Sequence, residues 1–353
     1  MSKRNLIIAA VVLVCLAVVS QWLGNSGKKV TDDKIGKPPL AIKTVDEFDT
    51  LVLKDAEGTL HLKKQDEQWV IEEKNDYPVN MKEMLSLMDK LTANTVASLV
   101  TKDEKRHAYF QVVYWEEAEA GKETSGTQLT LLDQGEPVFR MIAGKTRQSK
   151  SDDPNMPAHA DGVYARIGDS PNIYLLKDAL SLTVDPAEWI RTTLFAMDKK
   201  EVKSIRLELP TERLLLERPE KGKAPVLSDL KETEKMDTFE RDGLLDKLEE
   251  FTIEDAILRS KVDEDRLQLK GEITISSYDS PDLTFRILQT PVSAGDDTEE
   301  AEYYVSFLAS TDSGDAPWAS VFQLNRKWLF TLDQWKAESW LTSRKDLIDS
   351  SSD

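Results

Sequence analysis

The feature that most restricts the fold of this chain is an internal repeat with a period of about 150 residues, a typical domain size. A strand-like segment at residues 48–53 returns at residues 202–207, and Leu91 of an apolar helical segment returns as Leu248. The further pairs predicted at similar spacing are residues 128–131 with 272–275, 163–165 with 303–305, 173–176 with 321–324, and Trp189 with Trp340. Such spacing predicts two copies of one folding unit.

Each copy combines alternating apolar and polar residues, which predict strands, with one capped helical stretch. Asn80 and Asp237 each stand three residues before a glutamate, a spacing typical of a helix start. We therefore predict an α+β fold in which mostly antiparallel sheet is covered on one face by a helix. The expected parts are a first α+β repeat at residues 41–196, a second at 197–345 and a disordered tail at 346–353.

The N-terminus carries a different pattern, an uncharged apolar run from Leu6 to Leu23 that follows Lys3 and Arg4. As a helix this run would be about 27 Å long, close to the roughly 30 Å hydrocarbon core of a bilayer. The run therefore predicts a single transmembrane helix that acts as a signal anchor. The expected parts are a short cytoplasmic tail at residues 1–5, the anchor at 6–23 and a linker at 24–40.

Two interpretations of the apolar run remain open, a retained anchor and a signal peptide cleaved after Ser20. Trp22 favours the anchor, because tryptophan is common at a membrane interface. The short tail before the run favours an inside N-terminus, while Lys28 and Lys29 beyond it partly balance the charge. We expect a single-pass protein of a bacterial inner membrane with the bulk of the chain in the periplasm.

The charge of the chain excludes one class of partner. It has 64 acidic and 46 basic residues and a net charge of −18, so the polyanionic backbone of a nucleic acid would be repelled. Cys15 is the only cysteine, which rules out a disulfide framework and a thiolate metal site.

Residues able to carry out chemistry are few. His61 lies in an alternating strand and His107 in a charged connection, and both are expected to face solvent. His159 is the best case for a metal site, because three carboxylates stand near it in one loop, at Asp152, Asp153 and Asp161. The prolines and glycine of that loop predict a solvated acidic loop instead. We predict no catalytic, cofactor-binding or metal-binding residue and no cofactor.

Several motifs together resemble a known bacterial family. They are a hairpin at residues 51–62, Trp69-Val70-Ile71, Tyr77-Pro78-Val79-Asn80, and Val163 to Gly168 followed by Ile173 to Leu176. This combination resembles the family called domain of unknown function 4340, present as two copies. The resemblance implies an envelope accessory protein, often encoded beside an ABC transporter of the gliding-motility or auxiliary type, and no active-site residue.

The predicted function is that of a membrane-anchored extracytoplasmic accessory subunit of an ABC-type transport system that works through protein–protein interaction. Its expected partners are the transporter permease or other envelope proteins, and the membrane through residues 6–23. We predict that the chain is not an enzyme. Two alternatives remain open, a periplasmic ligand- or glycan-binding protein and an envelope hydrolase with a carboxylate site.

Overall fold

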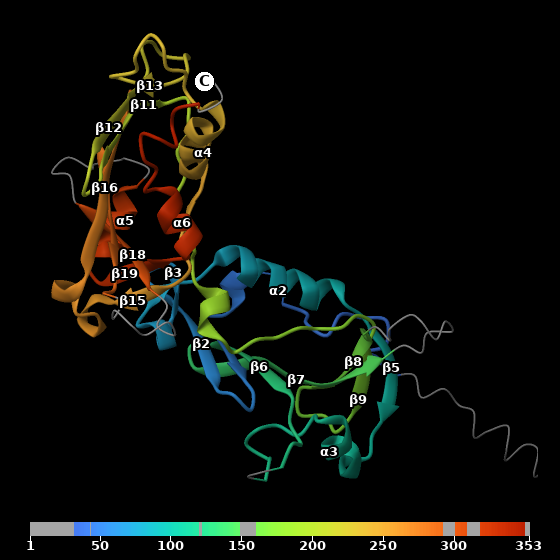
Figure 1. Cartoon of the computed structure of the whole chain (residues 1–353). Helices are drawn as coiled ribbons and strands as arrows, with labels where there is room; N and C mark the ends of the chain where they lie inside the picture. The colour runs from blue at the N-terminus through green and yellow to red at the C-terminus, as the bar shows by residue number, and fades with distance from the viewer. Residues whose placement is uncertain are drawn as a thin grey trace, which may run out of the picture. The chain divides into compact units, whose positions relative to one another are not determined.

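The computed structural model describes residues 32–42, 44–119, 122–148, 160–291, 301–308 and 318–349. The chain divides into two compact units (Figure 1). The first unit comprises Met1–Asp49, Leu53–Gly58 and Leu87–Leu182. The second comprises Thr50–Val52, Thr59–Ser86 and Thr183–Asp353.

The first sheet has nine strands in the order β4-β3-β2-β1-β6-β7-β8-β9-β5. Alternation sets its buried face, since Leu60 and Leu62 of β2 are inaccessible to solvent and the residues between them are not. The strands are β1 (Thr50–Lys54), β2 (Thr59–Gln65), β3 (Gln68–Ile71), β4 (Tyr77–Pro78), β5 (Val96–Thr101), β6 (Thr127–Asp133), β7 (Glu136–Gln148), β8 (Ala160–Ile167) and β9 (Ile173–Leu176).

The second sheet has eight strands in the order β13-β12-β11-β16-β17-β18-β19-β15, and a separate two-stranded sheet pairs β10 with β14. The neighbouring strands of the eight-stranded sheet pair antiparallel. In the first sheet, β6 with β7 and β8 with β9 also pair antiparallel. The strands are β10 (Thr193–Phe195), β11 (Val202–Glu208), β12 (Arg213–Glu217), β13 (Val226–Leu227), β14 (Phe251–Thr252), β15 (Ala256–Leu258), β16 (Gln268–Ser277), β17 (Leu283–Gln289), β18 (Tyr303–Leu308) and β19 (Trp328–Leu332).

The two sheets share one strand order. Read from β3, the first runs β3-β2-β1-β6-β7-β8-β9-β5, and the second runs β13-β12-β11-β16-β17-β18-β19-β15. In both sheets the first strand lies between its hairpin partner and a later strand, β6 beside β1 and β16 beside β11. The far edge is closed by β5 in the first sheet and by β15 in the second. This order requires the same crossovers twice, which unrelated sheets would rarely share.

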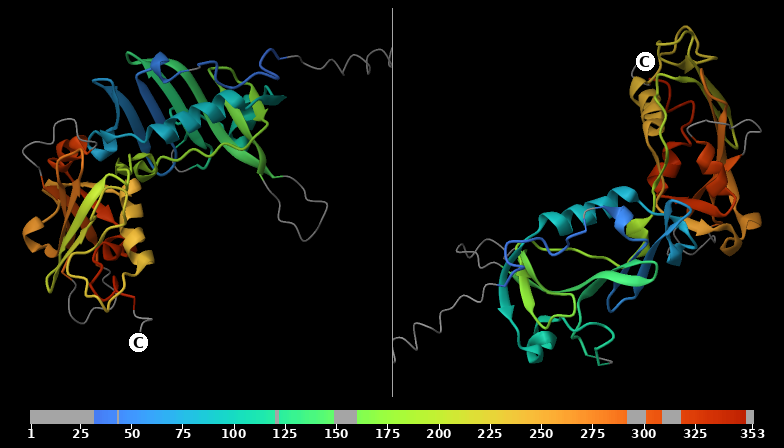
Figure 2. Two further views of the ribbon diagram at one scale, coloured as in Figure 1. Left: turned by 90° about the horizontal axis from the view of Figure 1, so that it is seen from above. Right: turned by 180° about the vertical axis from the view of Figure 1, so that it is seen from behind.

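Short helices connect the strands. The α-helices of the described residues are α2 (Met81–Ala93), α3 (His107–Phe110), α4 (Thr238–Glu249), α5 (Ala319–Asn325) and α6 (Gln334–Ser339). The 3₁₀ helices in the same ranges are η1 (Val45–Glu47), η2 (Glu72–Lys74), η3 (Glu104–Arg106), η4 (Pro186–Trp189), η5 (Arg259–Lys261) and η6 (Glu264–Arg266). Figure 2 shows α2 lying against one face of the strands beside it, and its Leu87, Met88 and Leu91 are buried at helical spacing.

Helices α2 and α4 begin in the same way. The amide of Asn80 donates to the carbonyl of Trp189 at 2.7 Å, and the amide of Asp237 donates to the carbonyl of Leu347 at 2.9 Å. An isolated bridge joins the neighbouring residue in each case, Val79 to Ile190 and Met236 to Ile348. A distant chain segment therefore holds the residue before each helix.

This geometry corrects two of the sequence pairings. Leu347, and not Trp340, occupies the position that corresponds to Trp189. Residues 321–324, expected to form a strand like 173–176, lie within α5, where Val321 and Phe322 are buried. The strand that corresponds to β9 in the shared order is β19. Buried apolar residues suit a short helix as well as a strand, so the pattern alone could not separate them.

Aromatic side chains form the core beneath the second sheet. The rings of Phe285 and Trp340 meet edge to face at 5.1 Å, and Phe251 lies 5.3 Å from Phe285 and 5.7 Å from Phe307. Helices α4 and α6 lie on this face of the strands in both views (Figures 1 and 2). Such ring pairs add to the free energy gained from burying their area.

The expected fold class, α+β with an N-terminal transmembrane helix, is wrong. The described residues are mostly antiparallel strand, and the longest helix among them, α2, has 13 residues. Within the described ranges no helix has both the length and the apolar character needed to cross a membrane, which also corrects the membrane and signal-anchor predictions. Residues 6–23, on which those predictions relied, lie outside the described residues.

The ends of the described chain join the fold. Leu40 and Leu347 are buried, and Gly36 and Lys37 exchange backbone hydrogen bonds with Val96 at 2.8 and 2.9 Å. The segment from Gly36 to Leu40, within the expected linker, and Leu347 and Ile348, within the expected tail, therefore contribute to the packed structure.

Removal of the α4 cap tests how much this helix start contributes to stability. One carboxylate oxygen of Asp237 accepts from the amides of Phe239 and Glu240 at 2.9 and 3.1 Å. We expect Asp237→Ala to lower the free energy of unfolding by about 1 kcal/mol, measured by urea titration. Asp237→Asn keeps the acceptor and should lose clearly less. Equal losses in both variants would contradict a role for the side-chain hydrogen bonds.

Candidate functional site

Only part of the acidic loop predicted to hold His159 falls within the described residues. Asp152, Asp153 and His159 lie outside the described residues, and Asp161 pairs with Arg147 at 2.8 Å. His107 was expected to face solvent and is instead buried at the start of α3, with its Nε2 2.8 Å from the carbonyl of Pro171. The structure therefore gives no support for chemistry at Asp161 or His107.

His61 is the histidine with carboxylates around it. Its Nδ1 lies 2.7 Å from Glu73 and 3.9 Å from Glu72, and the three side chains offer ligand atoms within 4.8 Å of one another. Lys63 pairs with Glu72 at 2.5 Å, and this hydrogen bond is the main reason that the pKa of Glu72 lies below its ordinary value. These hydrogen bonds indicate a surface network of paired charges.

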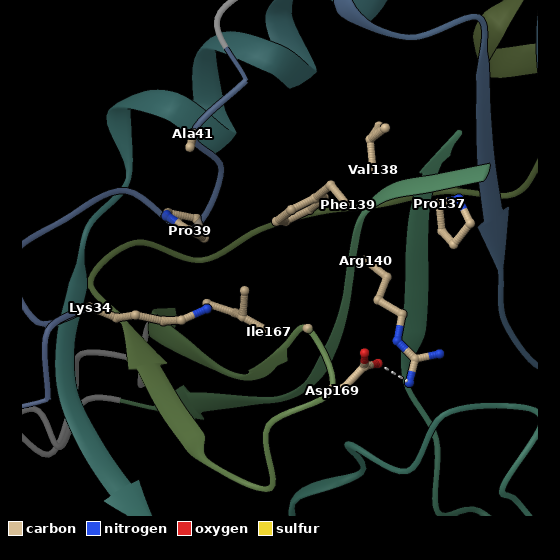
Figure 3. Close-up of a pocket in the computed structure, with 10 residues that line it drawn as sticks. Lys34, Pro39, Ala41, Pro137, Val138, Phe139, Arg140, Ile167 and Asp169 are labelled. Carbon is tan, nitrogen blue, oxygen red and sulfur yellow. Dashed lines mark ion pairs between the residues drawn. The ribbon is translucent and has the colours of Figure 1, made fainter. Parts of the chain in front are cut away.

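A larger candidate is a cavity of about 540 Å³ in the first unit (Figure 3). Three parts of the chain form its wall: the segment before β1, the beginning of β7, and the end of β8 with the turn that follows. The lining residues are Lys34, Pro39, Ala41, Pro137, Val138, Phe139, Arg140, Ile167, Gly168 and Asp169.

The apolar part of the wall comes from the first residues of β7. The register between β6 and β7 shifts at Leu131 and Leu132, where strand alternation is interrupted. Val138 is 47% exposed and Phe139 is half-buried, while Ile167 opposite them is buried. An exposed apolar strip beside a cavity is typical of a binding surface.

Arg140 forms the polar part of the wall. Its guanidinium pairs with Glu116 at 3.0 Å and with Asp169 at 2.8 Å, the second pair being drawn in Figure 3. Its Cζ lies 4.0 Å from the ring centroid of Tyr114. The Nε atom is buried and has no hydrogen-bond partner within the described part of the chain. Arg140 is therefore held in place with one donor unused.

The buried Tyr114 ring lies between two guanidinium groups and helps to hold Arg140 in place. A second guanidinium, that of Arg166, lies 4.5 Å from its ring and pairs with Glu117 at 2.7 Å. The Tyr114 hydroxyl donates to the carbonyl of Gly168 at 2.9 Å. Burial raises the pKa of Tyr114 to about 12, although Arg140 and Arg166 act in the opposite direction. A buried neutral tyrosine thus fixes the turn that carries Asp169.

Lys34 is the other cation of the cavity. Its backbone amide donates to Asp32 at 3.1 Å, and the described residues give its ammonium group no ion pair. None of the ten lining residues is a serine, threonine, cysteine, histidine or tyrosine. The cavity wall therefore offers an apolar strip and an ammonium group, and its lining residues include no hydroxyl, thiol or imidazole side chain.

A second cavity, of about 570 Å³, lies in the second unit and is acidic. Three of its carboxylates already have partners. Asp255 pairs with Lys74 at 2.6 Å, Glu302 accepts from the Tyr304 hydroxyl at 2.5 Å, and Asp333 lies 3.7 Å from Lys336. For these three carboxylates the contacts indicate structural pairing.

Comparison with known proteins identifies one family. Residues 154–271 match the family model described as Domain of unknown function (DUF4340). The chain thus contains a DUF4340 domain in this range, which supports the resemblance found from the motifs. No curated protein and no solved structure matches the chain.

The sequence did not predict the cavity of the first unit, which Val138 and Arg140 line. The signal available was the run Pro137-Val138-Phe139 directly after the tight turn at Gln134 and Gly135, whose positive φ angles of 51° and 84° mark it as a hairpin connection. An apolar run at a strand start is also normal for a core strand. Only the register shift shows that Val138 is exposed.

Replacement of Tyr114 tests the support beneath the cavity. We expect Tyr114→Phe to lower the free energy of unfolding by about 1 kcal/mol, because the carbonyl of Gly168 loses its donor. The raised pKa adds a pH dependence: the neutral hydroxyl stabilises the fold fully below pH ~10, and this contribution is lost as pH rises towards 12.

The measurement is urea unfolding at pH 7 and between pH 9 and 12. Tyr114→Phe should show a smaller alkaline loss than the parent chain. The control is Tyr109→Phe, because Tyr109 is 67% exposed and its hydroxyl should contribute little. A Tyr109→Phe effect as large as that of Tyr114→Phe would show that the hydrogen bond to Gly168 is not responsible.

Proposed function

We propose that this protein is a non-catalytic binding subunit that receives a segment of a partner protein in the cavity of its first unit. The observation that carries the proposal is the composition of the cavity wall. Val138 and Phe139 offer an apolar strip, and Lys34 offers an ammonium without an ion pair in the described chain. A partner segment with an apolar side chain and a nearby acidic one would complement both features.

The fixed geometry of Arg140 supports binding without rearrangement. Its two ion pairs and the Tyr114 ring hold the guanidinium in one orientation. A pre-ordered wall loses little side-chain entropy when a partner binds, which favours affinity.

We further propose that the chain consists of two copies of one sheet-based unit. The shared strand order of the two sheets supports this, as does the common start of α2 and α4, where a distant carbonyl accepts from the residue before the helix. The family match at residues 154–271 covers the end of the first sheet and the beginning of the second. The boundaries at residues 41–196 and 197–345 stay predictions.

For the partner, we propose a component of an ABC-type transport system, such as its permease. The support is the resemblance to the DUF4340 family and the charge of the cavity wall. A glycan would be expected to meet several hydrogen-bonding side chains that are free to bind it, whereas Arg140 and Asp169 already pair with each other at 2.8 Å. The apolar strip of Val138 and Phe139 beside the Lys34 ammonium therefore favours a protein segment over a sugar.

The experiment places a photo-cross-linking amino acid at position 138 of the full chain in living cells, with position 226 as the matched control. Val226 is also an exposed valine on a strand, 36% exposed on β13, and it does not line the cavity. We expect position 138, and not position 226, to cross-link to one protein, identified by mass spectrometry. Val138→Glu should weaken its capture by the purified chain at least about tenfold, because a buried carboxylate costs free energy.

The outcomes separate the parts of the proposal. Cross-linking to a transport component would support both the cavity and the partner class. Cross-linking to a protein of another kind would refute the transporter assignment and leave the binding role intact. Equal capture by the parent chain and Val138→Glu, with no cross-link at 138, would refute the binding role of the cavity.

A further inference from the structure

Lys247 in the second unit is a partly buried lysine without a carboxylate partner. It lies on α4, and its Nζ donates to the carbonyl of Ser339 at 2.6 Å and lies 5.4 Å from the ring centroid of Trp340. Within the described residues no carboxylate forms an ion pair with it. An ammonium has three protons to donate, so this side chain has unused donors in an aromatic environment.

A small cavity of about 130 Å³ opens beside this ammonium. Trp335 and Trp340 form aromatic walls, and Trp335 is 66% exposed. The remaining lining residues come from the end of α4 and the residue after it, from β14, from the end of β19 and from α6. They are Glu250, Phe251, Thr252, Leu332, Lys336 and Ser339, together with Lys247 itself.

The other charges around the cavity already have partners. Lys336 donates to the Thr252 hydroxyl at 3.0 Å and lies 3.7 Å from Asp333. Glu250 accepts from the Thr193 hydroxyl at 2.8 Å. Lys247 is therefore the cavity cation that lacks both a carboxylate and a side-chain acceptor among the described residues.

We propose that this Lys247 cavity binds a carboxylate group attached to a small apolar body. The carboxylate would pair with the Lys247 ammonium, and the apolar body would lie against Trp335 and Trp340. A phosphate group fits less well, because its charge and its three oxygens call for several donors and only one ammonium is free. The site is separate from the cavity of the first unit and does not depend on the proposed function.

The electrostatics of Lys247 agree with this geometry. Burial lowers its pKa from an ordinary value near 10.5 to about 8, and Glu240 on the same helix opposes the shift only in part. A bound carboxylate would stabilise the charged form and raise this pKa again. Binding should therefore weaken as pH rises from 7 towards 9.5. The other charged groups near Lys247 and its cavity are Glu240, Glu250, Asp333 and Lys336.

The experiment titrates the full chain with sodium benzoate and sodium butyrate and follows tryptophan fluorescence and heat. We expect saturable binding of both acids, and none of the neutral amides benzamide and butyramide. Lys247→Met keeps the apolar stem and removes the charge, so it should weaken binding at least about tenfold. Lys200→Met is the matched control, because Lys200 is an exposed lysine of the same unit, and it should leave binding unchanged.

Two peptides test whether the bound carboxylate is a protein C-terminus or belongs to a small free acid. A short peptide that ends in a free carboxylate after an apolar residue is compared with its amidated form. Tighter binding of the free peptide than of benzoate would indicate a protein C-terminus, and the reverse order would indicate a small free acid. Both orders support a carboxylate site. Equal binding of acids and amides, or unchanged binding in Lys247→Met, would overturn it.

The stability of the ligand-free chain gives an independent test. A lysine with a lowered pKa destabilises the folded state while it is charged, and this cost disappears as pH rises from about 8 to 10.5. We expect Lys247→Met to be more stable than the parent chain at pH 7 in urea titrations. The difference should become smaller at pH 10.5, whereas Lys200→Met should match the parent chain at both pH values.

Discussion

The burial of one face of each sheet beneath a helix is the interaction on which the rest of the structure depends. In the second unit, Phe251, Phe285 and Trp340 pack between the strands and the helices α4 and α6. An antiparallel sheet with one apolar face is stable only when that face is covered. The covering helix must therefore start at a fixed place, and the hydrogen bonds from Asn80 to Trp189 and from Asp237 to Leu347 provide that place.

Both candidate sites lie where this regular scaffold is locally interrupted. A register shift between β6 and β7 leaves Val138 exposed beside the cavity of the first unit. In the second unit, the short helix α6 places the exposed Trp335 beside the Lys247 cavity. A buried aromatic ring lies near a cation at each site: Tyr114 near Arg140, and Trp340 near Lys247. Such rings fix the position of a charged group at low entropic cost, which suits recognition.

Much of the strand framework was predictable from the chain. Alternation located β1, β2 and β3, and the spacing of Leu91 from the capping residue Asn80 located α2. The cap of α4 by Asp237 was also expected from its position before Glu240. At Asn80 the spacing to Glu83 marked the helix start correctly, but it did not show the contacts made there: the amide of Asn80 donates to the carbonyl of Trp189, and its side chain accepts from the amide of Lys82. A partner more than 100 residues away cannot be read from a local motif.

The sequence by itself determined which segments alternate, where the two long helices begin, and that similar segments recur along the chain, because these depend on local spacing. The predictions from sequence were wrong where the pattern is ambiguous. Residues 321–324 were expected to form a strand and lie within α5, and His107 was expected to face solvent and is buried. The tertiary structure alone decided the common strand order, the exposure of Val138 and the contact of the Lys247 ammonium with the Ser339 carbonyl and the Trp340 ring. Each of these depends on which distant segments share a face, and that is set by the packing of the whole core.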